Sequence, residues 1–310
     1  MKTYDILCAS KAMSPLTHNS GSEGNETLVA QEQVVTDLGP RWIPHLSGNA
    51  LRHKMVREPG ARFLVDRWGL MGQVELRLLQ FLFHGGALES GNPLESVQRI
   101  RTWWRLFPLV RVVGGSLPDM IVGGSLHAWR GTLVCRENET RVRQHAPTGW
   151  MGSGRLLSAD RFVGRYQYVR QDAGRTVPDL AKQELMALEP ESGQMIYSGQ
   201  CVSAGAVFLH GFRLRAAKTC DLGCLLLSLA LWSRDNGTIG GMASRGHGRI
   251  DMAAMLPDDV DGDAAIAEYV AHVDAVKDEA IDWLRSEFGK KDKPAKGKKA
   301  KAVEGNGDAG

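Results

Sequence analysis

The sequence has few cysteines, and no two of them lie at the spacing of a metal or disulfide motif. The 310 residues contain five cysteines, at positions 8, 135, 201, 220 and 224, and no CxxC pair. An odd number of cysteines without a framework excludes a disulfide scaffold and argues against a zinc site. We therefore predict free thiols, a reducing cytoplasmic location and no bound metal ion.

Long apolar runs are also absent. A helix that crosses a membrane needs roughly 18 to 20 apolar residues, and the longest apolar run, at 222–232, is shorter. The N-terminal MKTYDILCAS has no extended apolar region of the kind that signal peptides contain. We expect neither a membrane partner nor a signal peptide.

The familiar cofactor and catalytic motifs are missing as well. The glycine-rich segment TIGGMASRGHGRIDM contains no GKS or GKT, which excludes a Walker A loop, and it does not open a long helix as a dinucleotide-binding GxGxxG turn would. No Ser/His/Asp set and no pair of carboxylates stands out in the sequence. We expect no cofactor and no catalytic residue.

What the sequence does have is an uneven distribution of charge. The net charge is +3, but the Lys-rich tail at 289–310 carries +4 and the segment 251–288 carries −9, so residues 1–250 carry +8. Most of that excess is arginine, whose planar guanidinium suits phosphate groups. A basic body therefore points to nucleic acid as a partner. The tail, rich in Lys, Ala and Gly, is predicted to be disordered.

The segment IPHLSGNALRHKMVR, residues 43–57, predicts a basic helix with a capped start. Ser47 stands at the N-cap position, and apolar residues follow at helical spacing. The unpaired N–H groups and partial positive charge of a helix start favour phosphate. The residues that would grip a polyanion backbone here are Ser47, Asn49, Arg52, His53 and Lys54. The alternative is an ordinary capped helix with solvated basic side chains.

Patterns along the rest of the chain predict a mixture of strands and helices. Strands are expected at 3–12, 120–122, 125–135, 183–188 and 204–215. Helices are expected from 64 to the glycine pair at 85–86, and at 93–104, 222–234 and 266–288. A Gly-, Ser- and Asn-rich stretch at 18–26 predicts a mobile loop. Trp103 and Trp104 lie beside several arginines and would either stack on bases or, as we favour, pack in a core.

Two further segments suit contact with nucleic acid. Around 144–179, tyrosines alternate with basic residues, as in a projecting β-hairpin; its candidate contact residues are Arg155, Arg161 and Arg165. A glycine loop precedes a short strand and carries Gly240, Gly241, Arg245, Gly246, His247, Gly248 and Arg249. Glycines let a polynucleotide backbone approach closely. The alternatives are a solvated hairpin without a partner and a tight turn before an edge strand.

The order of these segments resembles the RAMP superfamily of CRISPR-associated proteins. IPHLSGNALRHKMVR is similar to the IPGSSLRG signature of that superfamily. IGGMASRGHGRI, which follows the apolar DLGCLLLSLALW, is similar to its C-terminal glycine-rich loop. The resemblance covers about residues 1–255, and within the superfamily it points to the Cas seven-type backbone subunit of type IV effector complexes.

The resemblance implies an α+β fold: a modified RRM-like (ferredoxin-like) palm with inserted helical fingers and a protruding β-hairpin thumb. The palm would occupy 1–66, 119–143 and 183–255, the fingers 67–118 and the thumb 144–182. One C-terminal amphipathic helix at 256–288 and the tail at 289–310 would follow.

The resemblance also implies a function. Copies of such a subunit stack along a CRISPR RNA in a helical filament, the palm holds the guide backbone, and the thumb interrupts the guide–target duplex. The implied partners are CRISPR RNA, further copies of the chain, other type IV effector subunits, a helicase, and a complementary target that is DNA rather than RNA.

One departure from related proteins bears on catalysis. Type III backbone subunits cut target RNA with a metal and an Asp in the first loop, whereas here the loop at 18–35 offers Glu23, Glu26 and Glu32 but no Asp. We therefore predict a non-catalytic scaffold. The alternatives are a metal-dependent endoribonuclease that uses one of these glutamates and an oligomeric structural protein that does not bind RNA.

Overall fold

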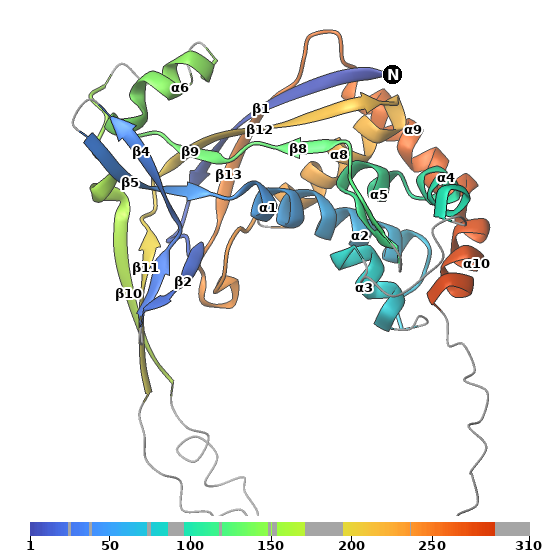
Figure 1. Ribbon diagram of the computed structural model, residues 1–310, viewed down its shortest axis with the longest axis horizontal. Helices are drawn as coiled ribbons and strands as arrows, with labels where there is room; N and C mark the ends of the chain where they lie inside the picture. Colours follow the sequence, from blue (N-terminus) through green and yellow to red (C-terminus); the bar gives the residue numbers. More distant parts are fainter. Residues whose placement is uncertain are drawn as a thin grey trace, which may run out of the picture.

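A computed structural model describes residues 1–23, 26–36, 39–72, 76–85, 96–117, 120–147, 150, 154–170, 195–235 and 237–288. Figure 1 shows a curved central sheet with helices on one side and at one end, and a narrow ribbon of strands that projects from the other end. The predicted tail, the predicted strand at 183–188 and the part of the predicted thumb beyond residue 170 up to 182 lie outside the described residues. No described helix is both long and apolar enough to cross a bilayer.

The central sheet has the ferredoxin-like arrangement. Its strands run in the order β13 (Ile250–Met255), β1 (Lys2–Ala12), β12 (Val207–Ala217), β9 (Gly131–Leu133), β5 (Gly39–Leu46) and β4 (Gln31–Thr36), and β8 (Leu126–Ala128) also pairs with β12. Neighbouring strands are antiparallel. Helices connect β1 to β8 and β12 to β13, so two strand–helix–strand units interleave. The predicted α+β fold with an RRM-like palm is confirmed.

Alternation in β1 explains which face of the sheet is covered. Tyr4, Ile6, Cys8 and Ser10 are buried, and the residues between them are more exposed. Because successive side chains in a strand point to opposite faces, one face of β1 packs on the core and the other is open. On this side of the sheet, α8 (Thr219–Arg234) contacts β12, and the helix that follows β5 contacts β8.

That helix is continuous but changes its pitch. It begins as α1 (Gly48–Leu51), becomes a π-helical segment, η1 (Arg52–Arg57), and ends as α2 (Glu58–Arg67). Leu51, Met55 and Val56 are fully buried, as the sequence predicts, whereas Ala50 is only partly covered. Single π-turns inside helices are rare and concentrate at functional sites.

The helical insertion contains α3 (Leu76–His84), α4 (Ser96–Leu106) and α5 (Pro108–Val113), followed by the small β6 (Gly115–Leu117) and β7 (Met120–Val122) pair. Trp103 is fully buried and packs against Phe81, with a ring-centroid distance of 5.2 Å. Its predicted place in the core is confirmed. Trp104 stays 37% exposed.

The C-terminal segment forms two helices, where the sequence pattern predicts one. Helix α9 (Gly262–Ala275) and helix α10 (Lys277–Phe288) are separated at Val276, whose ψ of 3° leaves the helical range. Helix α9 crosses α8 closely: a Cβ on Gly223 would lie 1.9 Å from the carbonyl oxygen of Ala265. Only glycine allows the two helices to approach this far.

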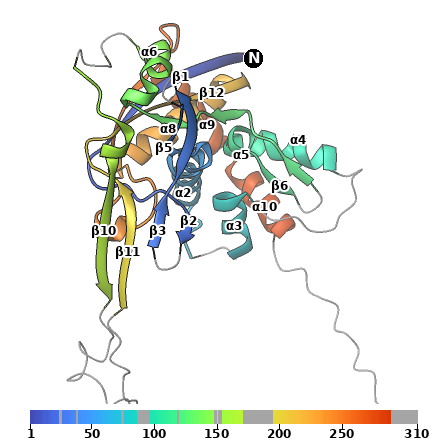
Figure 2. The ribbon, with the colours of Figure 1, turned by 60° about the vertical axis from the view of Figure 1, so that its left-hand side comes forward.

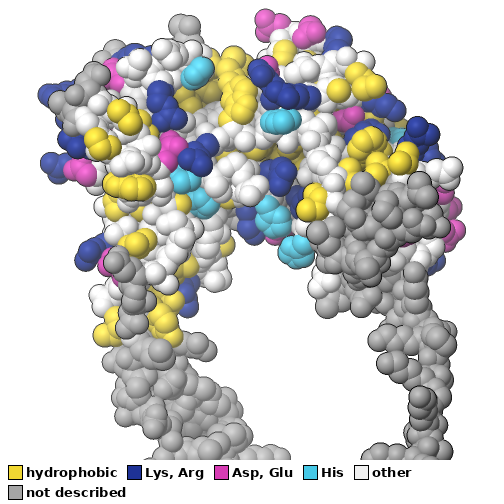
Figure 3. Space-filling model, viewed as in Figure 1, with side chains coloured by type: hydrophobic (Ala, Val, Ile, Leu, Met, Phe, Trp, Pro, Cys, Tyr) yellow, Lys and Arg dark blue, Asp and Glu magenta, His cyan; other side chains and the backbone are white. Residues whose placement is uncertain are grey.

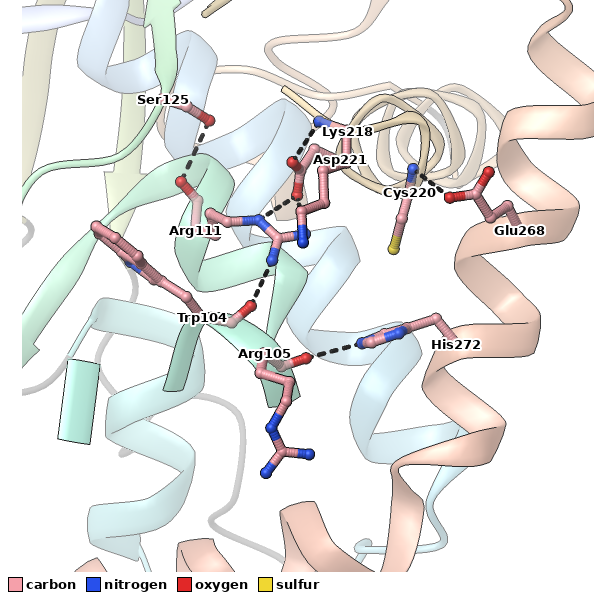
Figure 4. Close-up of polar contacts among 9 residues, drawn as sticks. All are labelled: Trp104, Arg105, Arg111, Ser125, Lys218, Cys220, Asp221, Glu268 and His272. Atoms are coloured by element: carbon pink, nitrogen blue, oxygen red, sulfur yellow. Dashed lines mark hydrogen bonds and ion pairs between the residues drawn. The ribbon is translucent and has the colours of Figure 1, made fainter. Parts of the chain in front are cut away.

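A polar joint fixes the helical insertion to α8 and α9 (Figure 4). Arg111 Nε donates to Asp221 Oδ1 at 2.6 Å, and Arg111 Nη1 donates to the carbonyl oxygen of Trp104 at 2.6 Å. His272 Nε2 lies 2.9 Å from the carbonyl oxygen of Arg105. The side chain of Asp221 is almost fully buried, so this ion pair is shielded from solvent on that side.

The projecting ribbon is a second sheet, with strand order β10-β11-β3-β2. It contains β10 (Val163–Arg170), β11 (Met195–Val202), β3 (Glu26–Val29) and β2 (Asn19–Glu23). Figure 2 shows β10 and β11 extending well beyond the body of the protein. We refer to β10 and β11 as the thumb.

Two expectations need correction here. The predicted loop at 18–26 instead forms much of the β2–β3 hairpin, and β3 is held by parallel pairing with β11. The predicted thumb range of 144–182 contains β10, but the strand that pairs with β10 lies later, at Met195–Val202. The tyrosine and arginine pattern marks only the first of the two strands.

Candidate nucleic-acid interface

The start of the basic helix has the predicted cap. Ser47 Oγ accepts a hydrogen bond from the backbone N–H of Ala50 at 3.2 Å, as an N-cap side chain does. The backbone N–H of Ser47 donates to Nε2 of His18 at 3.1 Å. Gly48 lies directly against β8, because a Cβ there would be 2.6 Å from the carbonyl oxygen of Ala128. The helix start is therefore fixed from two sides.

The predicted basic residues of the first turns have different surroundings. Arg52 bonds the side chain of Asn49 at 3.2 Å, and no acidic partner for Arg52 is present in the described part of the chain. Lys54 forms an ion pair with Glu58 at 2.8 Å. The ring of His53 stacks on that of His84 at 6.0 Å, and burial lowers its pKa, so the ring is neutral at pH 7.

Arg57, by contrast, is a buried structural residue. Its Nη2 donates to the carbonyl oxygens of Val113 and Gly114 at 3.0 and 2.8 Å. Burial, with a smaller contribution from Arg52, lowers its pKa to about 10. Arg57 thus joins the basic helix to the helical insertion.

The short segment after β1 connects the helix start with the glycine loop. The carbonyl oxygen of Thr17 accepts a hydrogen bond from the backbone N–H of Gly241 at 2.8 Å. The side-chain Oγ1 of Thr17 lies 2.7 Å from Nδ1 of His247. The next residue, His18, accepts from Ser47. Neither Thr17 nor His18 was predicted as a site residue, because neither belongs to a recognisable motif. Together they bring two predicted motifs, far apart in the sequence, into one surface.

The glycines of the loop serve two different needs. Gly240 and Gly248 have φ angles of +84° and +82°, and a Cβ on either would lie 2.3 or 2.2 Å from a backbone oxygen of Thr17 or Ile239. These two glycines are required by the turn and by close packing. Gly246 also has a positive φ of +82°, but no atom lies within 4 Å of its Cβ position. Gly246 therefore borders open space.

The loop also contacts the thumb. The guanidinium of Arg245 lies over the ring of Tyr168, 3.8 Å from its centroid. His247 meets Tyr166 edge-on at 5.3 Å, and Tyr168 stacks on Tyr197 at 5.1 Å. The aromatic residues predicted for the hairpin thus form a ladder at its base, against the glycine loop. Arg249 is exposed, and its backbone N–H donates to Ser14 Oγ at 3.0 Å.

The three predicted thumb arginines are exposed but are not joined to the helix start. Arg165 is 78% exposed and lies 3.6 Å from Glu26, and Arg161 lies 4.0 Å from Asp160. Arg155 is exposed in the segment before η4 (Ala159–Phe162). No hydrogen bond or ring contact links these three residues to residues 47–54 within the described chain. They extend the basic surface toward the thumb.

The three glutamates of the first loop lie on three different strands, β2, β3 and β4. Glu23 and Glu26 are opposite positions in the backbone register of the β2–β3 pair. Glu32, on β4, accepts from Arg130 at 2.7 Å and from Arg141 at 3.3 Å. Burial alone would raise the pKa of Glu32, but the two arginines lower it overall. Among the residues that the structure describes, no group of three His, Cys, Asp or Glu side chains is placed to share a metal ion.

Figure 3 shows the resulting surface. Lys, Arg and His side chains gather on the face between the thumb and the helical insertion, where the molecule is hollowed. The arrangement can offer cations, backbone N–H groups and aromatic rings to an extended anionic chain. These are the groups that proteins use to hold single-stranded nucleic acid.

Comparison with known proteins supports the fold. No protein-family profile and no curated protein matches the chain by sequence. Among solved structures, the fold is similar to that of a chain described as "Type IV-B CRISPR Complex". The two chains are 16% identical, the TM-score is 0.54, and the match covers 83% of this chain and 92% of the other. The chain therefore shares its fold with a component of a type IV CRISPR complex.

Proposed function

We propose that this protein is a CRISPR RNA-binding backbone subunit of a type IV effector complex. The observation that carries the proposal is the joint between the two predicted motifs: Ser47 contacts His18, and Thr17 contacts the glycine loop at Gly241 and His247. A capped helix start and a glycine loop in one basic surface are suited to gripping phosphates without reading bases. The similarity to a chain of a type IV-B complex supports the assembly in which this occurs.

In this proposal, copies of the chain stack along the guide and hold its backbone. Base pairing between the guide and its target supplies the sequence specificity, and the protein recognises backbone and shape. The thumb, anchored on the glycine loop through Tyr166 and Tyr168, separates stretches of the guide–target duplex. Other type IV subunits and a helicase complete the complex, and the target is DNA rather than RNA.

Two matched arginine variants test the proposal. Arg52→Ala removes a cation that has no acidic partner in the described chain, so RNA binding should weaken for all sequences alike. The slope of log binding constant against log salt concentration should become shallower by about one. Arg105→Ala is the control, because Arg105 is ion-paired with Glu279 on the helical side. Binding titrations at several salt concentrations measure both variants. Equal salt slopes for the two variants, or a loss limited to one RNA sequence, would reject the proposal.

We further propose that the subunit does not cut nucleic acid. The endoribonuclease alternative would cut RNA through a metal held by preorganised carboxylates, and Glu32 is engaged with two arginines in this structure. Assembled particles with a matching guide should bind labelled complementary RNA or DNA in Mg²⁺ or Mn²⁺ and leave it intact on a gel. Evenly spaced products that disappear when Glu23, Glu26 and Glu32 are changed to Gln would establish the endoribonuclease alternative.

A further inference from the structure

A pocket of about 340 Å³ opens on the exposed face of the central sheet, away from the helix start and the glycine loop. Its lining includes Leu7 of β1 and Leu209 of β12, which are adjacent strands. Helix α6 (Glu139–His145) borders it through Arg141. The volume falls in the range of small-molecule sites, roughly 300–1,000 Å³.

Two tryptophans line this pocket, and the first is firmly held. The backbone N–H of Trp129 donates to the carbonyl oxygen of Gly211 at 2.9 Å. Its ring lies on Gly211, where a Cβ would be 2.7 Å away. The guanidinium of Arg213 lies 5.7 Å from the centroid of the same ring, and Arg213 is itself held by two hydrogen bonds to Asp5. Trp129 is therefore a preorganised aromatic wall. Trp150 also lines the pocket.

The charged side chains that line the pocket are cationic. Arg130 and Arg141 are both about half exposed, and they share a single carboxylate, that of Glu32. One carboxylate between two guanidiniums leaves a net positive charge. None of the described lining residues is an Asp or a Glu. Aromatic walls with a cationic border suit a flat ring that carries an anionic group.

The pocket is connected to the proposed interface. Thr132, which lines it, lies directly opposite His45 in the β9–β5 pair. His45 in turn contacts His18 ring to ring at 6.1 Å, and His18 accepts the hydrogen bond from Ser47. A second hollow shares Leu7 and Trp129 with the pocket, which leaves room for a chain longer than one nucleotide.

We propose that this pocket binds one nucleotide of an RNA chain, with its base against Trp129 and Trp150 and its phosphate at Arg130 and Arg141. The proposal rests on the proposed function in taking RNA as the source of the nucleotide. It adds a base-stacking site to a surface that otherwise grips the backbone. Stacking on aromatic rings tolerates any base, so the site does not alter sequence specificity.

The first experiment compares two tryptophans in the full-length protein after removal of co-purified RNA. Trp150→Leu should lower affinity for a single-stranded RNA about tenfold, the effect of losing one stacked base. Trp104→Leu, in the helical insertion, is the matched control and should leave affinity unchanged. Leu209→Phe, which fills the pocket, should reproduce the loss if Trp150→Leu does not fold. Equal affinities for the pocket variants and the control overturn the proposal.

The second experiment locates the RNA directly. Photo-crosslinking with RNA that contains 4-thiouridine, followed by mass spectrometry, should label the peptide that carries Trp129 or the one that carries Trp150. Labelling only at the helix start or the glycine loop overturns the inference and leaves the proposed function intact. Binding of AMP in the pocket without RNA crosslinks there would assign it to free nucleotides and also overturn the proposal. If Arg52→Ala has no effect on RNA binding, the proposed function fails independently.

Discussion

The arginines of this protein lie in two regions that differ in how their charge is balanced. On the helical side, Arg67, Arg99 and Arg105 are ion-paired with Asp274, Glu287 and Glu279 of the C-terminal helices. Around the helix start and the glycine loop, Arg52 bonds an asparagine and Arg245 lies on a tyrosine ring. A count of arginines would treat the two regions alike. Their partners differ: one region uses arginine to hold the fold, whereas Arg52 and Arg245 in the other have no acidic partner among the described residues.

The largest expected effect comes from removing the acidic partners. Deleting residues 262–288 would remove Tyr269, Val273 and Leu284 from the buried core and would leave three arginines without their ion pairs. We expect an insoluble or unfolded chain, measured by soluble yield and circular dichroism. The control removes residues 290–310, and this variant should fold and assemble normally. A folded product of the first deletion would mean that the helical side does not depend on these helices.

The next largest effect tests whether the glycine loop on the basic side depends on the close approach of Gly240 to the backbone of Thr17. Gly240→Ala and Gly246→Ala both place a side chain at a positive φ, which costs about 1–2 kcal/mol. Only Gly240→Ala also forces a Cβ to 2.3 Å from the carbonyl oxygen of Thr17. Gly240→Ala should therefore lower the free energy of unfolding by several kcal/mol more, in urea titrations. Equal losses for the two variants would show that the Thr17 contact can relax.

Acid should weaken the palm before it affects the ion pairs of the helical side. Burial lowers the pKa of His210 to about 4, and its partner Ser10 Oγ lies 2.8 Å from Nε2. In the unfolded chain the ring of His210 takes up a proton near pH 6.5, whereas in the folded chain it does so only near pH 4. The stability that the neutral ring allows is therefore fully present above pH 6.5 and is lost as the pH falls toward 4. The loss from this group is roughly 3 kcal/mol.

The carboxylates of the helical side take up protons at a lower pH than the pH 6.5 at which the unfolded chain protonates His210. Hydrogen bonds from Arg67 and Arg105 lower the pKa of Asp274 and of Glu279, so their contribution persists until the pH falls through those lowered values. Urea unfolding at pH 7.5, 6.0 and 5.0 measures the difference. His210→Gln should flatten the dependence above pH 5. An unchanged slope in that variant would place the titrating group elsewhere.

The smallest expected effect tests whether a paired arginine becomes available to RNA when its acidic partner is removed. Glu32→Gln leaves Arg130 and Arg141 without their shared carboxylate. RNA affinity at low salt should rise a few-fold, and the log–log salt slope should grow by about one. Glu58→Gln beside Lys54 is a comparison variant on the basic helix itself. Lower affinity after Glu32→Gln would indicate that the glutamate itself faces the RNA.

Local patterns predicted much of the fold. The alternation of β1, the cap at Ser47 and the apolar stripe of the basic helix are set by neighbours in the sequence, so they could be identified from it. The core position of Trp103 was expected because tryptophans are more often buried than free to stack on bases, and the same expectation does not separate Trp103 from the partly exposed Trp104. Pairing over long distances could not be predicted. Arg99 meets Glu287 across 188 residues, and β11 joins β3 in a parallel pair that no local signal marks.

The candidate site was predicted only in parts. Both motifs were identified, but the residues that join them were not, because Thr17 and His18 act through a backbone carbonyl, a hydroxyl and a ring that any loop could contain. The split of the C-terminal segment at Val276 was missed because an apolar stripe continues in register across the break. The second thumb strand was missed because its composition differs from that of the first.

The joint between β1 and the glycine loop also bears on how such sequences diverge. Most of its hydrogen bonds join main-chain atoms: Gly241 to Thr17, Gly248 to Pro15, and Met13 to Arg249. Main-chain contacts place no demand on the side chains of the residues that make them, apart from the glycines at positive φ. Mutations can therefore accumulate through this region while its geometry persists. Proteins built in this way can share a fold at low sequence identity, as this chain does with a structural neighbour to which it is 16% identical.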